Sequence, residues 1–172
     1  MQAKFRLFGV LLLALTIGVV SMVSTATGAQ KRGKKVQVLN LTTRTAQEAD
    51  LDLGASGPSV GDRFVFSDDV FRGNQQIGIL GGECISVRLE PNPVPPGQEP
   101  TSATVNCVAS IQLPKGQLTA QGLVTFSAQA GNSFTIAITG GTRAYRTAHG
   151  QATIITSEEE NAPEGLRLKI IR

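Results

Sequence analysis

The chain has 172 residues, of which 41% are hydrophobic, with 16 Lys and Arg against 13 Asp and Glu, 2 Cys and 1 His. This length suits one domain. A single histidine excludes a multi-histidine metal site, and the sequence has no phosphate-binding loop or nucleophile elbow. No nucleic-acid-binding motif accompanies the basic residues, so we predict no nucleic-acid partner.

The first 29 residues are predicted to be a secretory signal peptide. Lys4 and Arg6 precede an uncharged, mainly apolar run over 7–23, and small residues follow up to Ala29. This order is typical of a signal that is cleaved. An uncleaved anchor is the alternative, although the apolar run is shorter than the roughly 20 residues that span a bilayer comfortably. We therefore expect a secreted, extracellular protein that has no membrane contact after signal removal.

Residues 30–35 are predicted to form a basic tail ahead of the folded domain, 36–172. Removing the two basic residues of the signal leaves 14 basic residues (16 minus 2) against 13 acidic ones, and removing the four of the tail leaves 10 against 13. The domain itself is therefore slightly acidic. The tail can touch an anionic surface or polymer, or it is simply a solvated chain end.

Short runs of Val, Ile, Phe and Thr between turn residues predict an all-β fold. The polar connection over 45–60 is irregular and is a candidate lid. Eight antiparallel strands with short turns bury their edges by closing into a barrel, which has room for packed side chains or one small ligand. The expected strands cover 36–44, 61–71, 76–90, 101–113, 117–128, 134–139, 145–156 and 166–171.

The two cysteines flank a proline-rich segment, 91–97, which forms the tip of a hairpin because it suits neither a helix nor a central strand. The midpoint between Cys84 and Cys107 falls inside this tip. Pairing about the midpoint puts the two cysteines opposite each other, near disulfide distance. A cross-strand disulfide is the favoured interpretation in an oxidising compartment, and a free thiol at a functional site is the alternative.

Four residues are candidates for acid/base catalysis: Asp68, Asp69, Tyr145 and His149. Asp68 and Asp69 are adjacent on a strand and point to opposite faces, so at most one faces the interior, where burial would raise its pKa. The alternative is a strand end at which both are solvated. Tyr145 and His149 are four residues apart on the predicted seventh strand and share a face, as an acid/base couple if that face is inward or as part of a barrel rim if it is not.

Three blocks of the sequence resemble the core blocks of the allene oxide cyclase and dirigent-protein superfamily: GDRFVFSDDVFRG at 61–73, IGILGGEC at 77–84 and AITGGTRAYRTAHG at 137–150. The resemblance runs from about residue 36 to the C-terminus, and the third block is the most specific. It implies a closed eight-stranded antiparallel barrel with an apolar cavity and no metal or redox cofactor. It also implies ring closure of a bound epoxide, as in the cyclases, or steered coupling of phenolic intermediates, as in dirigent proteins.

The sequence departs from the family pattern at several positions. The first strand offers Asn40, Thr42 and Thr43 where the cyclases are expected to carry a carboxylate, which argues against true allene oxide cyclase activity. Asp68 and Asp69 match the dirigent pattern. Arg143 and His149 depart from the pattern, because the family usually has glycine and arginine at these positions. Cys84 matches it, because the cyclases carry a cavity cysteine there.

The sequence therefore predicts a secreted barrel that binds a small apolar or phenolic ligand and directs its cyclisation or coupling without a cofactor. A non-catalytic ligand carrier or extracellular interaction barrel is the alternative. The barrel is also a candidate for homo-oligomer formation. The side chains expected to contact the ligand are Phe66, Leu80, Phe126 and Phe134.

Overall fold

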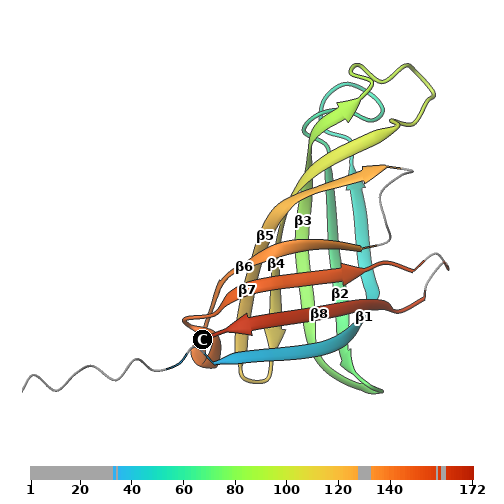
Figure 1. Ribbon diagram of the computed structural model, residues 1–172. Coiled ribbons are helices and arrows are strands. Elements are labelled where there is room, and N and C mark those ends of the chain that lie inside the picture. The colour runs from blue at the N-terminus through green and yellow to red at the C-terminus, as the bar shows by residue number, and fades with distance from the viewer. Residues whose placement is uncertain (1–32, 34, 128–132, 158, 160–161) are drawn as a thin grey trace, which may run out of the picture. The chain divides into compact units, whose positions relative to one another are not determined.

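The computed structural model describes residue 33, 35–127, 133–157, 159 and 162–172. In this part of the chain, eight antiparallel strands pair in chain order and close into a barrel through β1 and β8, as predicted (Figure 1). The strands are β1 (Val36–Leu51), β2 (Arg63–Arg72), β3 (Gln75–Glu90), β4 (Ser102–Leu113), β5 (Gly116–Ser127), β6 (Ser133–Gly141), β7 (His149–Ile155) and β8 (Glu164–Ile171).

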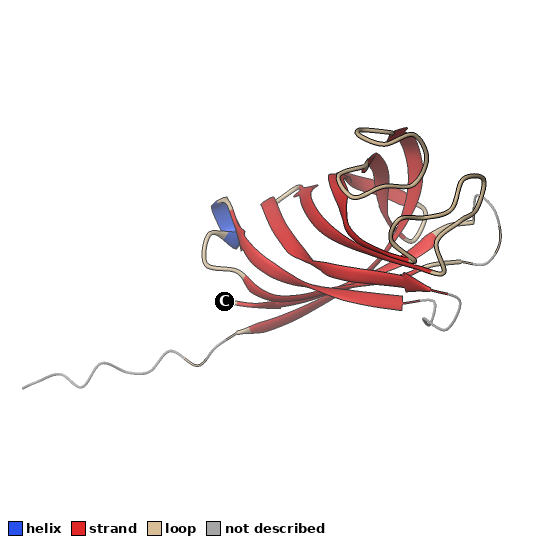
Figure 2. Ribbon diagram, turned by 90° about the horizontal axis from the view of Figure 1, so that it is seen from above, coloured by secondary structure: helices blue, strands red, loops and turns tan. Residues whose placement is uncertain are grey.

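The predicted signal peptide, 1–29, lies outside the described residues, as does most of the basic tail. Among the described residues the helical structure is one 3-10 turn, η1 (Arg143–Tyr145), which is drawn in blue near the C-terminus in Figure 2. No helix in the described part is long and apolar enough to cross a membrane.

One end of the barrel interior is packed solid. This end carries the β2–β3, β4–β5 and β6–β7 connections, and the strand alternation places large aliphatic side chains inward there. Each of these side chains is at most 1% exposed, so together they form a floor that excludes water. The floor residues are Val70, Ile111, Leu118, Leu168 and Ile170.

The connection after the first strand is shorter than predicted, and the prediction of a lid over 45–60 is not supported. β1 continues to Leu51, because this segment pairs with β2. The remaining loop is folded by the carboxylate of Asp62, which accepts hydrogen bonds from the backbone N–H of Leu53 at 2.9 Å and of Ser59 at 2.6 Å. The loop is thus tied to the start of β2.

The predicted seventh strand is wrong at its beginning. β6 runs through Gly141, where an added Cβ would lie 2.4 Å from the carbonyl oxygen of Gln117, so glycine permits the close approach of β5. The chain then forms η1, since the N–H of Tyr145 bonds to the carbonyl of Thr142 rather than to a neighbouring strand. β7 begins only at His149.

The disulfide prediction is confirmed. Cys84 on β3 lies directly across from Cys107 on β4, and the two form a disulfide. No free cysteine remains among the described residues, so the alternative of a free thiol is excluded for these two positions.

Candidate functional site

A cavity of about 360 Å³ occupies the barrel interior beyond the floor. It exists because the strands that supply large side chains to the floor place alanine two residues further along their inward faces, as in Ala109 on β4 and Ala120 on β5. Ala152 on β7 continues this small-residue wall. The volume suits a small organic molecule.

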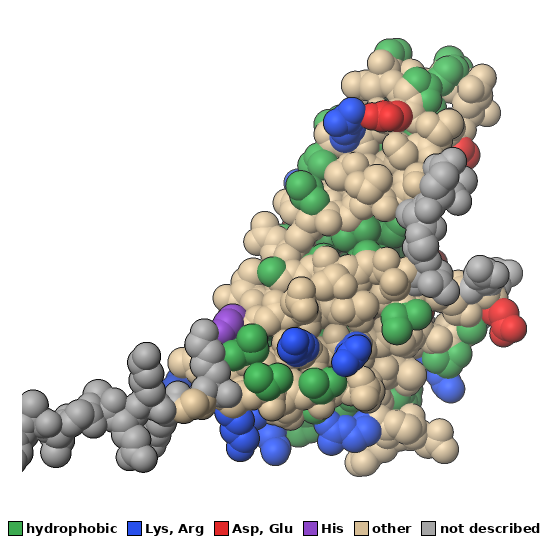
Figure 3. Space-filling model, viewed as in Figure 1, with side chains coloured by type: hydrophobic (Ala, Val, Ile, Leu, Met, Phe, Trp, Pro, Cys, Tyr) green, Lys and Arg blue, Asp and Glu red, His purple; other side chains and the backbone are tan. Residues whose placement is uncertain are grey.

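The four side chains expected to contact a ligand all line this cavity. Phe66 lies over Gly82 of β3, where a Cβ would come within 2.9 Å of the ring, and Leu80 closes the side next to the floor. Phe126 and Phe134 stand at the opposite end, and Phe126 is 46% exposed. Figure 3 shows hydrophobic side chains in a recess on the face of the barrel that is turned toward the viewer.

A β-bulge in β1 brings a carboxylate into the cavity wall. Thr43 and Thr45 face inward by regular alternation, and the β1–β2 register then shifts between Thr45 and Gln47. The extra residue returns Glu48 to the inward face, although it is three positions after Thr45. The sequence pattern predicts no carboxylate on the first strand because the predicted strand ends at residue 44.

Asp68 on β2 is the most buried acidic side chain of the cavity, at 7% exposed. Burial raises the pKa of its carboxyl, the hydroxyl of Thr45 donates a hydrogen bond that opposes the rise, and the charges of Glu48 and Asp69 add to it. Asp69 points to the outer face, as the strand alternation predicts, and accepts a hydrogen bond from Nε2 of Gln76 at 2.5 Å. Of the adjacent pair, Asp68 alone lines the cavity.

Glu164 supplies a further carboxyl, which sequence analysis missed. It lies at the start of β8 opposite Thr43, while Asp68 lies opposite Thr45, so β1 separates the two acidic residues. Burial raises the pKa of Glu164, and the negative charge of Asp68 raises it further. The signal was present: Glu164 shares the alternating phase of Leu166, which faces inward, but residues 157–165 were assigned to an acidic loop.

Tyr145 and His149 do not belong to this site. Tyr145 lies in η1, is 3% exposed and has the guanidinium of Arg172 over its ring at 5.7 Å. His149 is exposed, with Nδ1 at 3.3 Å from the carbonyl oxygen of Thr147. The predicted shared strand face does not form because the 3-10 turn interrupts the alternation between the two residues.

The cavity thus combines a mainly apolar interior with three carboxyls on one wall, those of Glu48, Asp68 and Glu164. Burial raises the pKa of both Asp68 and Glu164, and the negative charge of Asp68 further opposes ionisation of Glu164. Carboxyls with raised pKa values in a cavity are candidates for proton exchange with a bound molecule. Among the described residues, no group of three or more His, Cys, Asp or Glu side chains has the arrangement of a metal site.

The model of the allene oxide cyclase barrel-like domain matches residues 40–165. The chain belongs to this family. The match runs from β1 to the start of β8 and so includes the three cavity carboxyls, Glu48, Asp68 and Glu164. It confirms the family resemblance of the three sequence blocks.

Solved structures of other proteins share the barrel fold. A pyocyanin demethylase has 28% sequence identity and a TM-score of 0.63, with 78% of this chain and 99% of that chain covered. An exo-specific intermolecular Diels–Alderase has 14% identity and a TM-score of 0.62, with coverages of 80% and 99%. A pterocarpan synthase dirigent protein has 14% identity and a TM-score of 0.56, with coverages of 80% and 84%. No curated protein matches the chain.

Proposed function

We propose that this allene oxide cyclase-like barrel binds a small, mainly apolar molecule with a phenolic or similar polar group, and directs its cyclisation or coupling without a cofactor. The observation that supports this most is the carboxyl pair Asp68 and Glu164, which lies beside Glu48 in a mainly apolar cavity. In this role the apolar walls hold the reacting groups close together, and the pair exchanges a proton with the ligand.

The two sides of the cavity offer a ligand different contacts. The cavity-lining Phe66 and Ala109 offer dispersion contacts to a ring, whereas Asp68 offers the polar contact that orients it. A phenol fits this arrangement, because its hydroxyl donates to an ionised carboxylate or accepts from a protonated one. The disulfide and the signal-like N-terminus favour export, so we place the protein outside the cytoplasm.

A non-catalytic ligand carrier is the second candidate, and the cavity's apolar lining favours it. A carrier and a cyclisation catalyst need the same binding, but only the catalyst needs proton exchange at the carboxyl pair. A test must therefore separate binding from proton transfer.

The fluorescent phenol 2-naphthol makes that separation, because its excited state gives its proton to a nearby base and then emits as naphtholate. The protein has no Trp and one Tyr, so the probe is seen against a low background. We expect the bound probe to emit as naphtholate at neutral pH, and the double variant Asp68→Asn/Glu164→Gln to bind it while losing that emission. Asp69→Asn, whose side chain lies on the outer face, is the matched control and keeps the emission.

Unchanged naphtholate emission in the double variant would remove the proposed proton exchange and leave the carrier function. Failure of wild-type protein to bind 2-naphthol at all would remove phenol recognition. For the natural substrate, molecules that co-purify with the protein are to be identified by mass spectrometry and then incubated with it. Wild-type protein should convert the co-purified molecule or its precursor, and the double variant should not.

Pyocyanin is the first defined compound to test as a ligand, because the pyocyanin demethylase is 28% identical and is covered over 99% of its length. Pyocyanin is planar and aromatic and has one polar edge, which suits an apolar cavity with a carboxyl wall. Binding or consumption is followed through its visible absorbance. Saturable binding supports an aromatic heterocycle as the ligand class, and an unchanged spectrum at high protein concentration argues against it.

A further inference from the structure

The seam between β5 and β6 is paired over only part of its length. Pairing runs from Leu118 opposite Gly141 to Gln121 opposite Ala137, where it ends. On their other sides both strands remain paired much further, β5 with β4 as far as Ser127 and β6 with β7 back to its first residue. In Figure 1 the far part of β5 rises away from β6. Among the described residues, 122–126 of β5 and 133–136 of β6 therefore do not pair with each other across this seam.

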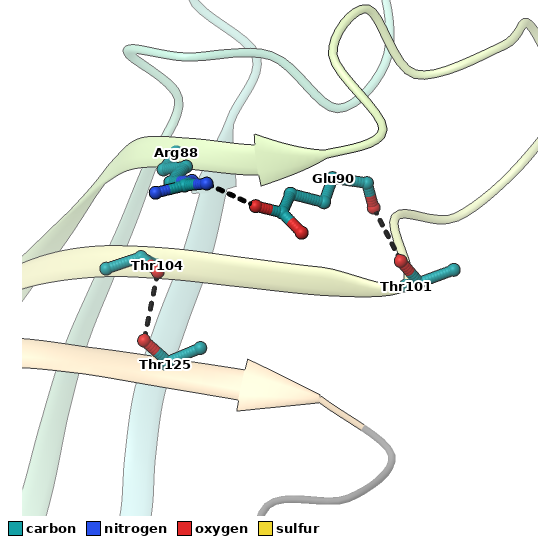
Figure 4. A network of polar contacts seen from close by, with 5 residues as sticks. All are labelled: Arg88, Glu90, Thr101, Thr104 and Thr125. Carbon is teal, nitrogen blue, oxygen red and sulfur yellow. Dashed lines mark hydrogen bonds and ion pairs between the residues drawn. The ribbon is translucent and has the colours of Figure 1, made fainter.

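The far part of β5 is held in place by β4 rather than left loose. The hydroxyls of Thr104 on β4 and Thr125 on β5 are 2.9 Å apart, and Thr101 donates to the carbonyl oxygen of Glu90 at 2.9 Å (Figure 4). An ion pair between Arg88 and Glu90 at 2.6 Å adds to this outer network. The opening thus lies between two supported strands.

In this opening the contact between β5 and β6 is made by two aromatic side chains. Next to the last paired residues, Ile136 of β6 leans over Gly122 of β5, where an added Cβ would come within 2.8 Å of it. Further out, Phe126 of β5 meets Phe134 of β6 edge to face, with ring centroids 5.8 Å apart. Both rings line the cavity, and Phe126 is 46% exposed, so cavity and solvent are separated here by side chains.

A ring contact of this kind is worth about 1 kcal/mol and rearranges by side-chain rotation. Separating paired strands would instead break several backbone hydrogen bonds. The β5–β6 opening is consequently the part of the described barrel wall through which an apolar group passes at the lowest cost.

The opening also faces the carboxyl wall. In the closed strand order β1 to β8, four strands separate the β1–β2 seam from the β5–β6 seam on either side. Thr45 and Asp68 pair across the β1–β2 seam, and Glu164 lies on β8, on the other side of β1. A ligand whose polar group reaches this pair points its opposite end at Phe126 and Phe134.

We propose that the ligand carries an apolar extension that leaves the cavity through the β5–β6 opening, between Phe126 and Phe134, while its polar group stays at Asp68 and Glu164. This inference rests on the proposed ligand binding in the cavity. It makes the two phenylalanines specificity-determining residues for ligand length. Ligands longer than a 360 Å³ cavity allows are then accepted, provided that the excess is apolar and extends from the end remote from the polar group.

The test is a series of 4-alkylphenols, from 4-ethylphenol to 4-octylphenol, titrated by calorimetry. We expect the affinity to rise by about fourfold per added methylene through the whole series. Phe134→Trp narrows the opening and should cost 4-octylphenol at least tenfold in affinity while leaving 4-ethylphenol within about twofold. Phe126→Trp, at a half-exposed position that tolerates bulk, repeats the measurement if Phe134→Trp does not fold.

Phe64→Trp is the matched control, because Phe64 also lines the cavity but stacks on Phe66 at 5.7 Å, away from the opening. The inference is overturned if affinity stops rising partway through the series in wild-type protein, or if the Trp variants weaken short and long phenols equally. Failure of 4-ethylphenol to bind points instead to failure of the proposed function itself. Tight binding of the short phenols with loss of the long ones confines the failure to the opening.

Discussion

The two halves of the barrel interior come from the same strands and behave differently. On β5, Leu118 belongs to the packed floor and is fully buried, while Ala120, the next inward residue, lines the cavity. On β4 the same change separates Ile111 from Ala109. Apolar burial at the floor stabilises the barrel, whereas the small residues above it give up dispersion contacts to leave space. Stability and ligand binding are thus assigned to different layers of one fold.

The acidic residues follow the same division. Asp68 and Glu164 lie in the hollow layer, where burial raises the pKa of each carboxyl and the negative charge of Asp68 raises that of Glu164 further. The floor residues are aliphatic. The electrostatic cost of the barrel interior is therefore concentrated where the proposed chemistry takes place.

The largest expected effect contrasts the two layers on one strand. Leu118→Ala should lower the free energy of unfolding by roughly 2–5 kcal/mol, because it leaves a cavity in the floor. Ala120→Leu fills existing space, so it should change stability by less than Leu118→Ala and abolish 2-naphthol binding. Urea unfolding and the naphthol titration measure the two quantities. Equal stability loss in both variants would contradict the division into a structural and a binding layer.

The disulfide tests how far the hollow layer depends on a covalent link. Cys84 and Cys107 are 23 residues apart in sequence, so their bond restricts the unfolded chain. Replacing both with Ser should cost about 2–4 kcal/mol in unfolding free energy. Urea unfolding of wild-type protein with and without a reductant is the parallel measurement, and agreement between the two is expected. A reduced protein as stable as the oxidised one would show that packing alone holds this layer.

Two adjacent glycines on β3, Gly81 and Gly82, differ in the space around them. Gly82→Ala would place a Cβ 2.6 Å from the carbonyl oxygen of Val108 and 2.9 Å from the ring of Phe66, and should cost about 1–3 kcal/mol in unfolding free energy. Gly81→Ala meets its nearest atom at 3.8 Å and should be neutral or slightly stabilising. Thermal unfolding of the two variants side by side checks this difference. Similar melting temperatures would argue against the close packing of Phe66 on β3.

The smallest expected effect is on the pH dependence of stability. Because the pKa of Asp68 is raised in the folded state, the folded protein holds this proton more tightly than the unfolded chain does. The resulting stabilisation is present at low pH and is lost as the pH rises from the ordinary carboxyl range through the raised pKa. Asp68→Asn should flatten this decline and be more stable than wild type at neutral pH. The urea midpoint against pH measures it, and Asp69→Asn, which removes a charge that adds to the rise in the pKa of Asp68, should flatten the decline less than Asp68→Asn does.

Local patterns sufficed for much of the fold. Alternation in segments such as Thr101 to Leu113 predicts the strands, and the symmetric placement of Cys84 and Cys107 about the proline-rich tip predicts their pairing. The aromatic residues Phe66, Phe126 and Phe134 were expected to line a cavity because the family resemblance supplied one, and they do line it. Period-two alternation carries this information because each strand residue's face depends only on its position in the strand.

What the sequence by itself determined, then, was the barrel, the disulfide and the alternation of side chains between the two faces of most strands. The tertiary structure alone decided which polar groups share the cavity. Glu48 faces inward because of a bulge that is defined by pairing with β2, and Glu164 approaches Asp68 because β8 closes the barrel against β1. Tyr145 lies in a 3-10 turn rather than in the expected strand because its backbone N–H bonds to the nearby carbonyl of Thr142. Register, bulges and closure depend on contacts between residues far apart in the chain, and local alternation does not encode them.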